Sequence, residues 1–393
     1  MHSFIANNVQ EMLKGIPDAD LYFSDLVAHV YLYGMINDSL ALAIVKGIAN
    51  ANGQATDLPI VMHIHSPGGN ITSGMAIMHA MLASRRPVVA VVDGMAFSMA
   101  AFLLVAAKHR VASPHAVVLF HELSAYVGDR NTELNAVAHQ SNEEERSLEE
   151  MVARHARIAP AALKRLHRRD KLLTAAACLR MGVVDRVMAR SPRGATHDSA
   201  TPKTFYLFCP YDDSGDDGFE SRASSAQKTP PYRRFVAETA DSVVASVAEF
   251  DRFVASVRDD PHPVSIRFNA CNNGAGVFAA LPWLARVTAC PLPVHAVINT
   301  SLNIADALAA IACDRRIMYS TGSLLLRRLE ALSYGGGEVV DDAVENNAVI
   351  AGIVRGVFRA HTRLPVATLD KNTTLLTPRD ALRLKVVDEV RQA

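Results

Sequence analysis

The sequence predicts an α/β protein with largely parallel sheets, in which one kind of domain occurs twice along the chain. Short runs of aromatic and β-branched residues alternate with longer helix-like segments, and this alternation is typical of parallel strands covered by helices. The length of 393 residues allows two domains. Two segments of the first half also have close counterparts in the second half.

The elements expected in the first half follow from these patterns. Strands are expected where apolar and β-branched residues cluster, at Ala28–Tyr33, Ile60–His65, Val88–Val92 and Val117–Phe120. Helices are expected over Leu40–Ala49, Ser73–Leu82, the apolar segment after Ser98, Leu134–Ala156 and Ala175–Met181. The pair Asp93-Gly94 is expected to belong to a turn just before Ser98.

The repeat rests on two pairs of matched segments. Thr174–Val187 is similar to Thr377–Val390, and each is expected to form a capped helix that runs into a short strand. Ala106–Val111 is similar to Ala312–Ile317. The first pair is separated by 203 residues and the second by 206, so the copies are nearly collinear and duplication is the better interpretation.

We therefore expect a first domain over residues 1–190, a linker over 191–203 and a second domain over 204–393. The linker is rich in Ser, Pro, Thr and Gly, which favour irregular structure. The polar segment 212–231 is interpreted as a loop inserted in the second copy.

Composition excludes several classes of function. The formal net charge is zero, so no overall field attracts nucleic acid or an anionic membrane. The longest apolar runs are too short to span a bilayer, and the first residues lack the pattern of a secretory signal. The five cysteines show no paired spacing and are interpreted as reduced, which favours a cytoplasmic location.

Three residues suggest hydrolytic chemistry. Ser98 precedes an apolar helix, where free backbone N–H groups and the helix dipole favour negative charge. His121 ends an apolar strand, and Asp170 lies in a polar segment farther along. A serine hydroxyl needs a base to become a nucleophile, and an imidazole base needs a carboxylate to orient it. Ser98, His121 and Asp170 are therefore a candidate catalytic triad.

The turn Ser66-Pro67-Gly68-Gly69 joins an expected strand to an expected helix. Its two glycines allow a sharp turn and a close approach to another group. The N–H groups of Gly69 and Met99 could point at the same position and form an oxyanion hole. Taken alone, this segment is more often an ordinary strand-to-helix turn.

These motifs together resemble the proteolytic subunit of the Clp protease. The resemblance rests on the order and spacing of five segments and covers about the first 190 residues, and the second half looks like a diverged copy of the same ClpP/crotonase-type domain. The five segments are Gly34–Asp38, Ser66–Met75, Ala96–Met99, Phe102–Leu104 and Leu119–His121.

The resemblance implies a role for each candidate residue. It implies Ser98 as nucleophile, His121 as general base, Asp170 as the group that orients the histidine, and Gly69 and Met99 as oxyanion donors. It also implies tandem ClpP/crotonase-like domains of β-β-α type, unfolded polypeptides or peptides as substrates, homo-oligomeric rings and an AAA+ unfoldase as partner. The chain has no Walker A motif, so any use of ATP would belong to that partner.

The second copy lacks these catalytic residues at the matching positions. Ile304 aligns with Ser98, Arg327 with His121 and Thr373 with Asp170. The second domain is therefore expected to be a pseudoenzyme domain.

Simpler interpretations exist for each residue taken singly. A serine at a helix start is usually a cap, and an aspartate beside basic residues is usually an ion-pair partner. Two other functions also stay open, a non-catalytic ClpP-like ring component and a crotonase-type acyl-CoA enzyme. His63 and His65 share one face of a strand, but no third ligand is apparent, so neither a metal nor a cofactor is expected.

Overall fold

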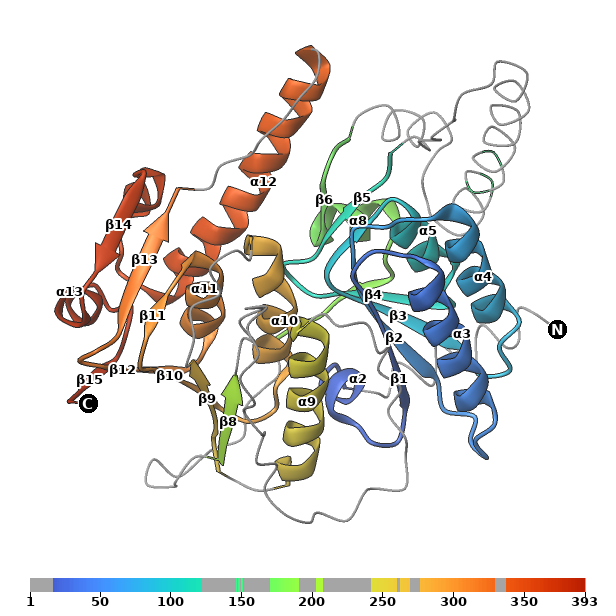
Figure 1. Ribbon diagram of the computed structural model, residues 1–393, viewed down its shortest axis with the longest axis horizontal. Coiled ribbons are helices and arrows are strands. Elements are labelled where there is room, and N and C mark those ends of the chain that lie inside the picture. The colour runs from blue at the N-terminus through green and yellow to red at the C-terminus, as the bar shows by residue number, and fades with distance from the viewer. Residues whose placement is uncertain are drawn as a thin grey trace, which may run out of the picture.

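The computed structural model describes most of both halves of the chain (Figure 1). The helix expected over 134–156, apart from single positions, and the polar segment 212–231 lie outside the described residues. The described residues are 17–121, 146, 148, 150, 170–190, 203–207, 242–259, 262–268, 276–328 and 337–392.

The first half is built on a seven-stranded, mostly parallel sheet. Its main path runs in the order β1-β2-β3-β4-β7, while β5 pairs with β3 and β6 pairs with β5. Only the β5–β6 pair is antiparallel. The strands are β1 (Ala28–Tyr33), β2 (Ile60–Ser66), β3 (Val88–Phe97), β4 (His109–Ala112), β5 (Val117–Leu119), β6 (Leu173–Thr174) and β7 (Arg186–Val187).

Helices cover both faces of this sheet, and nearly all residues of β1, β2 and β3 are buried. Val30, Met62 and Ala90 point to the face covered by α3 (Asp38–Asn52), α4 (Ile71–Leu82) and α5 (Met99–Ala106). The alternate residues, such as Val61 and Val89, belong to a second core shared with the other half of the chain. Burial on both faces explains why apolar residues dominate these strands.

The second half contains a five-stranded parallel sheet and a small three-stranded sheet. The five-stranded sheet has the order β15-β12-β10-β9-β8, and the small sheet has the order β11-β13-β14. The strands are β8 (Lys203–Leu207), β9 (Val264–Phe268), β10 (Val294–Ile298), β11 (Ser301–Leu302), β12 (Arg315–Tyr319), β13 (Ser323–Arg327), β14 (Thr373–Leu376) and β15 (Glu389–Arg391).

Strand registers in the two halves correspond. Met95 pairs with Val117 in the first half and Ser301 pairs with Ser323 in the second, and both residues of each pair are shifted by 206 positions. The same shift relates the pairs between β3 and β4 to those between β10 and β12.

An ion pair also occurs at corresponding places. Arg110 on β4 binds Asp185 through Nε and Nη2, and the Arg110 backbone N–H donates to the same carboxylate. Arg316 on β12 binds Asp388 with the same three donors. Arg110 thereby joins β4 to the residue before β7, and Arg316 joins β12 to the residue before β15.

The two halves share a core. In Figure 1, α9 (Ser242–Val257) and α10 (Leu281–Ala289) of the second half stand between the two sheets. Phe250 of α9 packs edge-on against Phe23, and Phe278 packs in the same way against Phe97. Helices of the second half, together with the short helix α2 (Asp20–Phe23), therefore cover the other face of the first sheet.

Among the described residues the expected elements are present, with bounds that agree within three residues except at the end of the third strand. β1 and the helix α8 (Ala175–Met181) have the expected bounds. β3 does not end in a turn at Asp93-Gly94 but continues to Phe97, with an irregularity between the pairs Ile64–Val92 and Ser66–Ala96. A Cβ on Gly94 would lie 2.5 Å from His65 Nδ1, so this glycine permits close packing rather than a turn.

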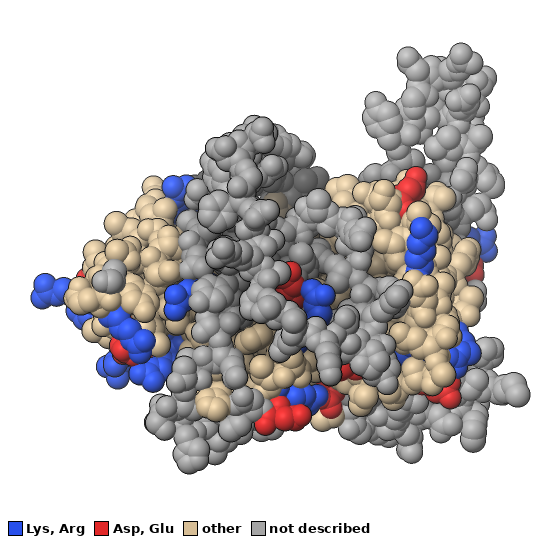
Figure 2. Space-filling view, turned by 60° about the horizontal axis from the view of Figure 1, so that its bottom comes forward, with Lys and Arg blue, Asp and Glu red and all other residues tan. Residues whose placement is uncertain are grey.

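Charged side chains gather unevenly on the face shown in Figure 2, where Lys and Arg are concentrated at the end formed by the second half. Arg315 and Arg391, two arginines of the second half, both bind Glu389, at 2.9 and 2.6 Å. Glu389 therefore offsets part of the positive charge of the second half. None of the described helices is both long and apolar enough to cross a membrane.

Candidate active site

Ser98 lies at the turn between β3 and α5. Its backbone has φ 53° and ψ −127°, a conformation that non-glycine residues rarely adopt. The Ser98 N–H donates to the Leu119 carbonyl at 2.9 Å, and the Ser98 carbonyl accepts from Ala101 N–H at 2.9 Å. Serine at the start of a helix usually caps it through its hydroxyl, but the Ser98 hydroxyl forms no such hydrogen bond to α5.

The glycine turn lies directly against this serine. Gly68 has φ 90°, and a Cβ on it would lie 2.6 Å from the Phe97 carbonyl oxygen and 2.7 Å from Ser98 Cβ. Gly69 has φ 146°, and a Cβ on it would lie 2.3 Å from the Ile36 carbonyl oxygen. Both positions therefore require glycine, for conformation and for space.

The turn is held in place by the segment before α3. Ile36 N–H donates to the Gly68 carbonyl at 2.7 Å, and Asn70 N–H donates to the Ile36 carbonyl at 2.8 Å. Asn70 also caps α4 by accepting from Ser73 N–H at 2.9 Å. These bonds fix Gly69 from both sides.

Two backbone donors remain available beside Ser98. Met99 is the first residue of α5, where an N–H group has no acceptor within the helix. Among the described residues, neither the Met99 N–H nor the Gly69 N–H has a hydrogen-bond partner. Both donors belong to segments in contact with Ser98, as an oxyanion hole requires.

Strand pairing directs the other two candidate residues to the same edge. Phe97 pairs with Leu119, so the chain that continues to His121 runs beside the chain that continues through Ser98. β6 pairs antiparallel with β5, with Val118 opposite Leu173. The same register, continued by three residues, would set His121 opposite Asp170.

His121 is partly buried and takes part in an interaction, whereas the side chain of Asp170 is exposed.

The second half differs at the corresponding place in more than its side chains. Asn303 caps α11 (Ile304–Ala312), and its side chain accepts from the N–H groups of Ala305 and Asp306 at 2.8 and 3.0 Å. Ala305 is the residue 206 positions after Met99, so the matching amide is already occupied. Arg327 and Thr373, which align with His121 and Asp170, are direct partners across β13 and β14.

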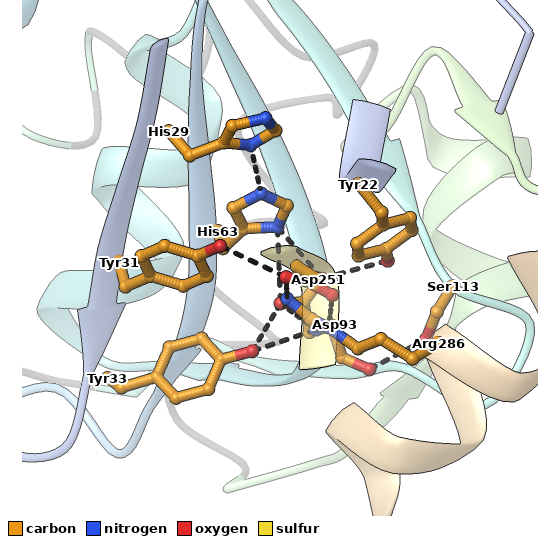
Figure 3. Close-up of polar contacts among 9 residues, drawn as sticks. All are labelled: Tyr22, His29, Tyr31, Tyr33, His63, Asp93, Ser113, Asp251 and Arg286. Atoms are coloured by element: carbon orange, nitrogen blue, oxygen red, sulfur yellow. Dashed lines mark hydrogen bonds and ion pairs between the residues drawn. The ribbon is translucent and has the colours of Figure 1, made fainter. Parts of the chain in front are cut away.

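A buried polar cluster joins the two halves of the chain (Figure 3). Arg286 of α10 donates to Asp93 of β3 at 2.5 Å and to Asp251 of α9 at 3.0 Å, and none of these side chains is exposed to solvent. Tyr22 and Tyr33 donate to Asp93, and Tyr31 donates to Asp251 at 3.0 Å. Only one feature of the sequence points to this cluster, a single arginine within the largely apolar helix α10.

The charges of this cluster shift several pKa values. Burial alone raises the pKa of Asp93, but the nearby Arg286 and His63 outweigh it and hold the pKa well below its usual range. Burial lowers the pKa of Arg286, but Asp251 and Asp93 outweigh it and the pKa lies above its usual value. Asp93 and Arg286 are therefore both charged at neutral pH.

The two histidines of the cluster extend it away from Arg286. His63 lies 3.3 Å from Asp93, the two rings are joined at 3.0 Å, and His29 Nε2 lies 2.9 Å from the Ser24 carbonyl. Carbonyl and carboxylate oxygens only accept hydrogen bonds, so each ring directs an N–H group to an oxygen, His29 to Ser24 and His63 to Asp93.

Within the described residues, no group of three or more His, Cys, Asp or Glu side chains is arranged to hold a metal ion. His65, the other histidine of the His63-x-His65 motif, is buried, and its Nδ1 has no hydrogen-bond partner. Burial lowers the pKa of His65 to about 4, so this ring is neutral at pH 7.

The first half has a serine at a strand-to-helix turn, a double-glycine turn against it and two backbone amides beside it, and acyl-transfer enzymes with an oxyanion hole share these features. Comparison with known proteins shows the family. The family model "Clp protease" matches residues 20–191. The ATP-dependent Clp protease proteolytic subunit 1 of Frankia casuarinae is 31% identical over 176 residues, which cover 44% of this chain and 83% of that protein.

The proteolytic subunit 2 of Rhodococcus jostii is 30% identical over 164 residues, which cover 41% of this chain and 84% of that protein. The chain therefore belongs to the Clp protease family.

Proposed function

We propose that this protein is a serine-type endopeptidase whose first half hydrolyses peptide bonds through an acyl-enzyme. The observation that carries the proposal is the backbone of Ser98, which is held at φ 53° against Gly68 and beside the Met99 amide. A strained turn that presents a hydroxyl beside free N–H groups serves nucleophilic attack better than it serves helix capping.

The proposed mechanism assigns one task to each residue. His121 accepts the proton of the Ser98 hydroxyl as its oxygen attacks the scissile carbonyl, and the N–H groups of Met99 and Gly69 stabilise the oxyanion. His121 then protonates the leaving amine, and Asp170 orients the imidazole and stabilises its charge. Water, deprotonated by His121, attacks the acyl-enzyme and releases Ser98.

Family membership and the relatives' names support the proposed partners. Those relatives are named proteolytic subunits of an ATP-dependent protease. We extend to this chain the assembly into homo-oligomeric rings and the supply of unfolded polypeptides by an AAA+ ATPase. Native mass spectrometry tests the assembly, and ATP-dependent degradation that needs an added unfoldase tests the partner.

We also propose that the second half is a degenerate copy of the first, with a domain boundary within residues 191–203. The shared strand registers and the equivalent Arg110–Asp185 and Arg316–Asp388 ion pairs support this duplication. The cap that Asn303 forms on the Ala305 amide supports the loss of catalysis there.

Hydrolysis of a fluorogenic peptide tests the proposed activity. Wild-type protein is expected to cleave the peptide, and the Ser98→Ala and His121→Ala variants are expected to lose at least about 1,000-fold in kcat/KM. The Ser301→Ala variant, which changes an exposed serine of the second half, is the control and should retain full activity. Equal activity of wild-type and Ser98→Ala protein would refute the assignment.

A further inference from the structure

The loop that carries Asp170 is attached to the second half of the chain. Asn346 of α12 (Gly337–His361) donates from Nδ2 to the Asp170 carbonyl and accepts from the Leu172 N–H at its Oδ1, at 2.7 Å. Lys171, between these two residues, forms an ion pair with Glu345 at 2.6 Å. Three consecutive residues of the first half are therefore held by two consecutive residues of α12.

We propose that Asn346 is a positioning residue for Asp170, through which the second half sets the geometry of the active site in the first. The proposal rests on the proposed peptidase function, in which Asp170 orients His121. It gives the second half a task in the reaction that requires no catalytic residue of its own.

The chemistry of the side chain suits this task. A primary amide has both a donor and an acceptor, so Asn346 can bind the carbonyl of one residue and the N–H of the residue two positions later. Asn346 thereby pairs with the backbone of the loop through one donor and one acceptor, as the backbone of a neighbouring strand would. Aspartate at this position could still accept from the Leu172 N–H, but when ionised it could not donate to the Asp170 carbonyl.

The loop has a specific need for this support. Asp170 lies just before β6, which is only two residues long, and its side chain is exposed. Short exposed segments lose their geometry easily, because few buried contacts hold them. A carboxylate displaced by about 1 Å no longer orients the imidazole, and such a displacement can reduce the rate about 100-fold.

The proposal does not assign Asn346 any contact with substrate. Its effect should therefore pass entirely through Asp170 and His121. A residue that merely stabilised the fold would lower the amount of active protein and leave the pH dependence of the reaction unchanged.

The test measures the rate constant for labelling of Ser98 by a fluorophosphonate as a function of pH in the full-length protein. The variants are Asn346→Ala, Asn346→Asp and Asp170→Asn, together with the double variant Asn346→Ala/Asp170→Asn. Asn347→Ala is the matched control, because Asn347 lies on the same helix and lines a cavity of about 230 Å³ on the second half beside Ile304.

The expected results separate positioning from folding. Asn346→Ala should slow labelling about 10- to 100-fold and shift the pH at which the rate is half-maximal in the direction that Asp170→Asn shifts it. The double variant should be no slower than Asp170→Asn alone, because both changes remove the same interaction. Asn347→Ala should label as the wild type does.

Hydrogen exchange provides a second readout that does not depend on activity. The Leu172 amide should exchange about 10-fold faster or more in Asn346→Ala than in the wild type, while amides of β1 and β2 should be unchanged.

Two outcomes would overturn the proposal, and they can be told apart. Wild-type labelling rates and pH dependence in Asn346→Ala would exclude a positioning role and leave the peptidase assignment intact. No labelling of Ser98 in the assembled wild type would overturn the peptidase assignment, and with it the role of Asn346.

Discussion

Arg286 in the second half donates to Asp93 in the first half at 2.5 Å, and both side chains are completely shielded from solvent. The same guanidinium binds Asp251, and its plane lies over the ring of Tyr22. Arg286 thus neutralises charge on both sides of the junction. A buried carboxylate that loses its cation is costly, so the two halves should depend on this one side chain.

Replacement of Arg286 by methionine should therefore destabilise the protein by about 3–5 kcal/mol, because Asp93 and Asp251 are left buried without a counter-charge. The free energy of unfolding in urea measures the effect. Arg315→Met is the matched control, since Arg315 binds Glu389 at the surface and its loss should cost less than about 1 kcal/mol. Equal losses in the two variants would contradict the assigned importance of the junction.

His65 should make the stability depend on pH below neutrality. Burial lowers its pKa from 6.5 to about 4. The unfolded chain therefore binds a proton at a pH where the folded protein does not, so the contribution of His65 to stability is complete above about pH 6.5 and is lost progressively as the pH falls towards 4. His65→Leu should reduce the loss of stability over this interval by about 3 kcal/mol.

Unfolding free energies at pH 7, 5.5 and 4 test this prediction. His79→Leu, a change at an exposed histidine, serves as the control and should keep the wild-type pH dependence. If wild-type and His65→Leu protein lose stability in parallel, His65 is not the neutral buried histidine that the structure indicates.

Gly68→Ala should impair the candidate site more than the fold. The added Cβ would lie 2.7 Å from Ser98 Cβ, and the backbone has φ 90°. We expect a loss of about 1–3 kcal/mol in stability and at least about 10-fold slower reaction at Ser98, because the turn must move away from the serine. Gly276→Ala meets no atom within 4 Å and should leave the reaction rate unchanged. A Gly68→Ala variant with the wild-type rate would show that Gly68 does not need to approach Ser98.

Asn303→Ala should lower stability without creating activity in the second half. The asparagine caps two N–H groups of α11, and loss of such a cap costs about 0.5–2 kcal/mol. The freed Ala305 amide has no nucleophile beside it, because Ile304 occupies that position. The variant Ser98→Ala/Asn303→Ala should therefore show no peptidase activity, and activity in this variant would contradict the pseudoenzyme assignment.

Local patterns predicted the regular elements well. The strand Ala28–Tyr33 and the helix Ala175–Met181 have the bounds that periodicity and capping indicated, because each is defined by its own residues. The Thr174 cap is one example, since its side chain accepts from the Ala177 N–H as expected.

Contacts between distant segments could not be predicted in the same way. Gly94 was expected in a turn, because a glycine after a strand usually ends it. Its actual role depends on His65 and on Leu281 of the second half, whose Cβ would lie 2.8 Å from a Cβ added there. The Asp93–Arg286 pair and the Asn346 contacts likewise join segments far apart in sequence, and single side chains carry no periodic signal.

The candidate site contains both features that local patterns predicted and features that depend on contacts between distant segments. The turn at Ser98 and the glycines were evident from the sequence, since the residue types themselves indicate the geometry. The path that brings Asp170 towards His121 depends on the pairing of β5 with β6, two strands of two or three residues that local patterns hardly reveal.

The most direct test of the central claim is the site of reaction of a fluorophosphonate with the purified, assembled protein, mapped by peptide mass spectrometry. We predict one adduct per chain, located on Ser98, which disappears in Ser98→Ala and slows strongly in His121→Ala. A wild-type protein that stays unmodified, or that carries its adduct elsewhere, would contradict the assignment of the active site.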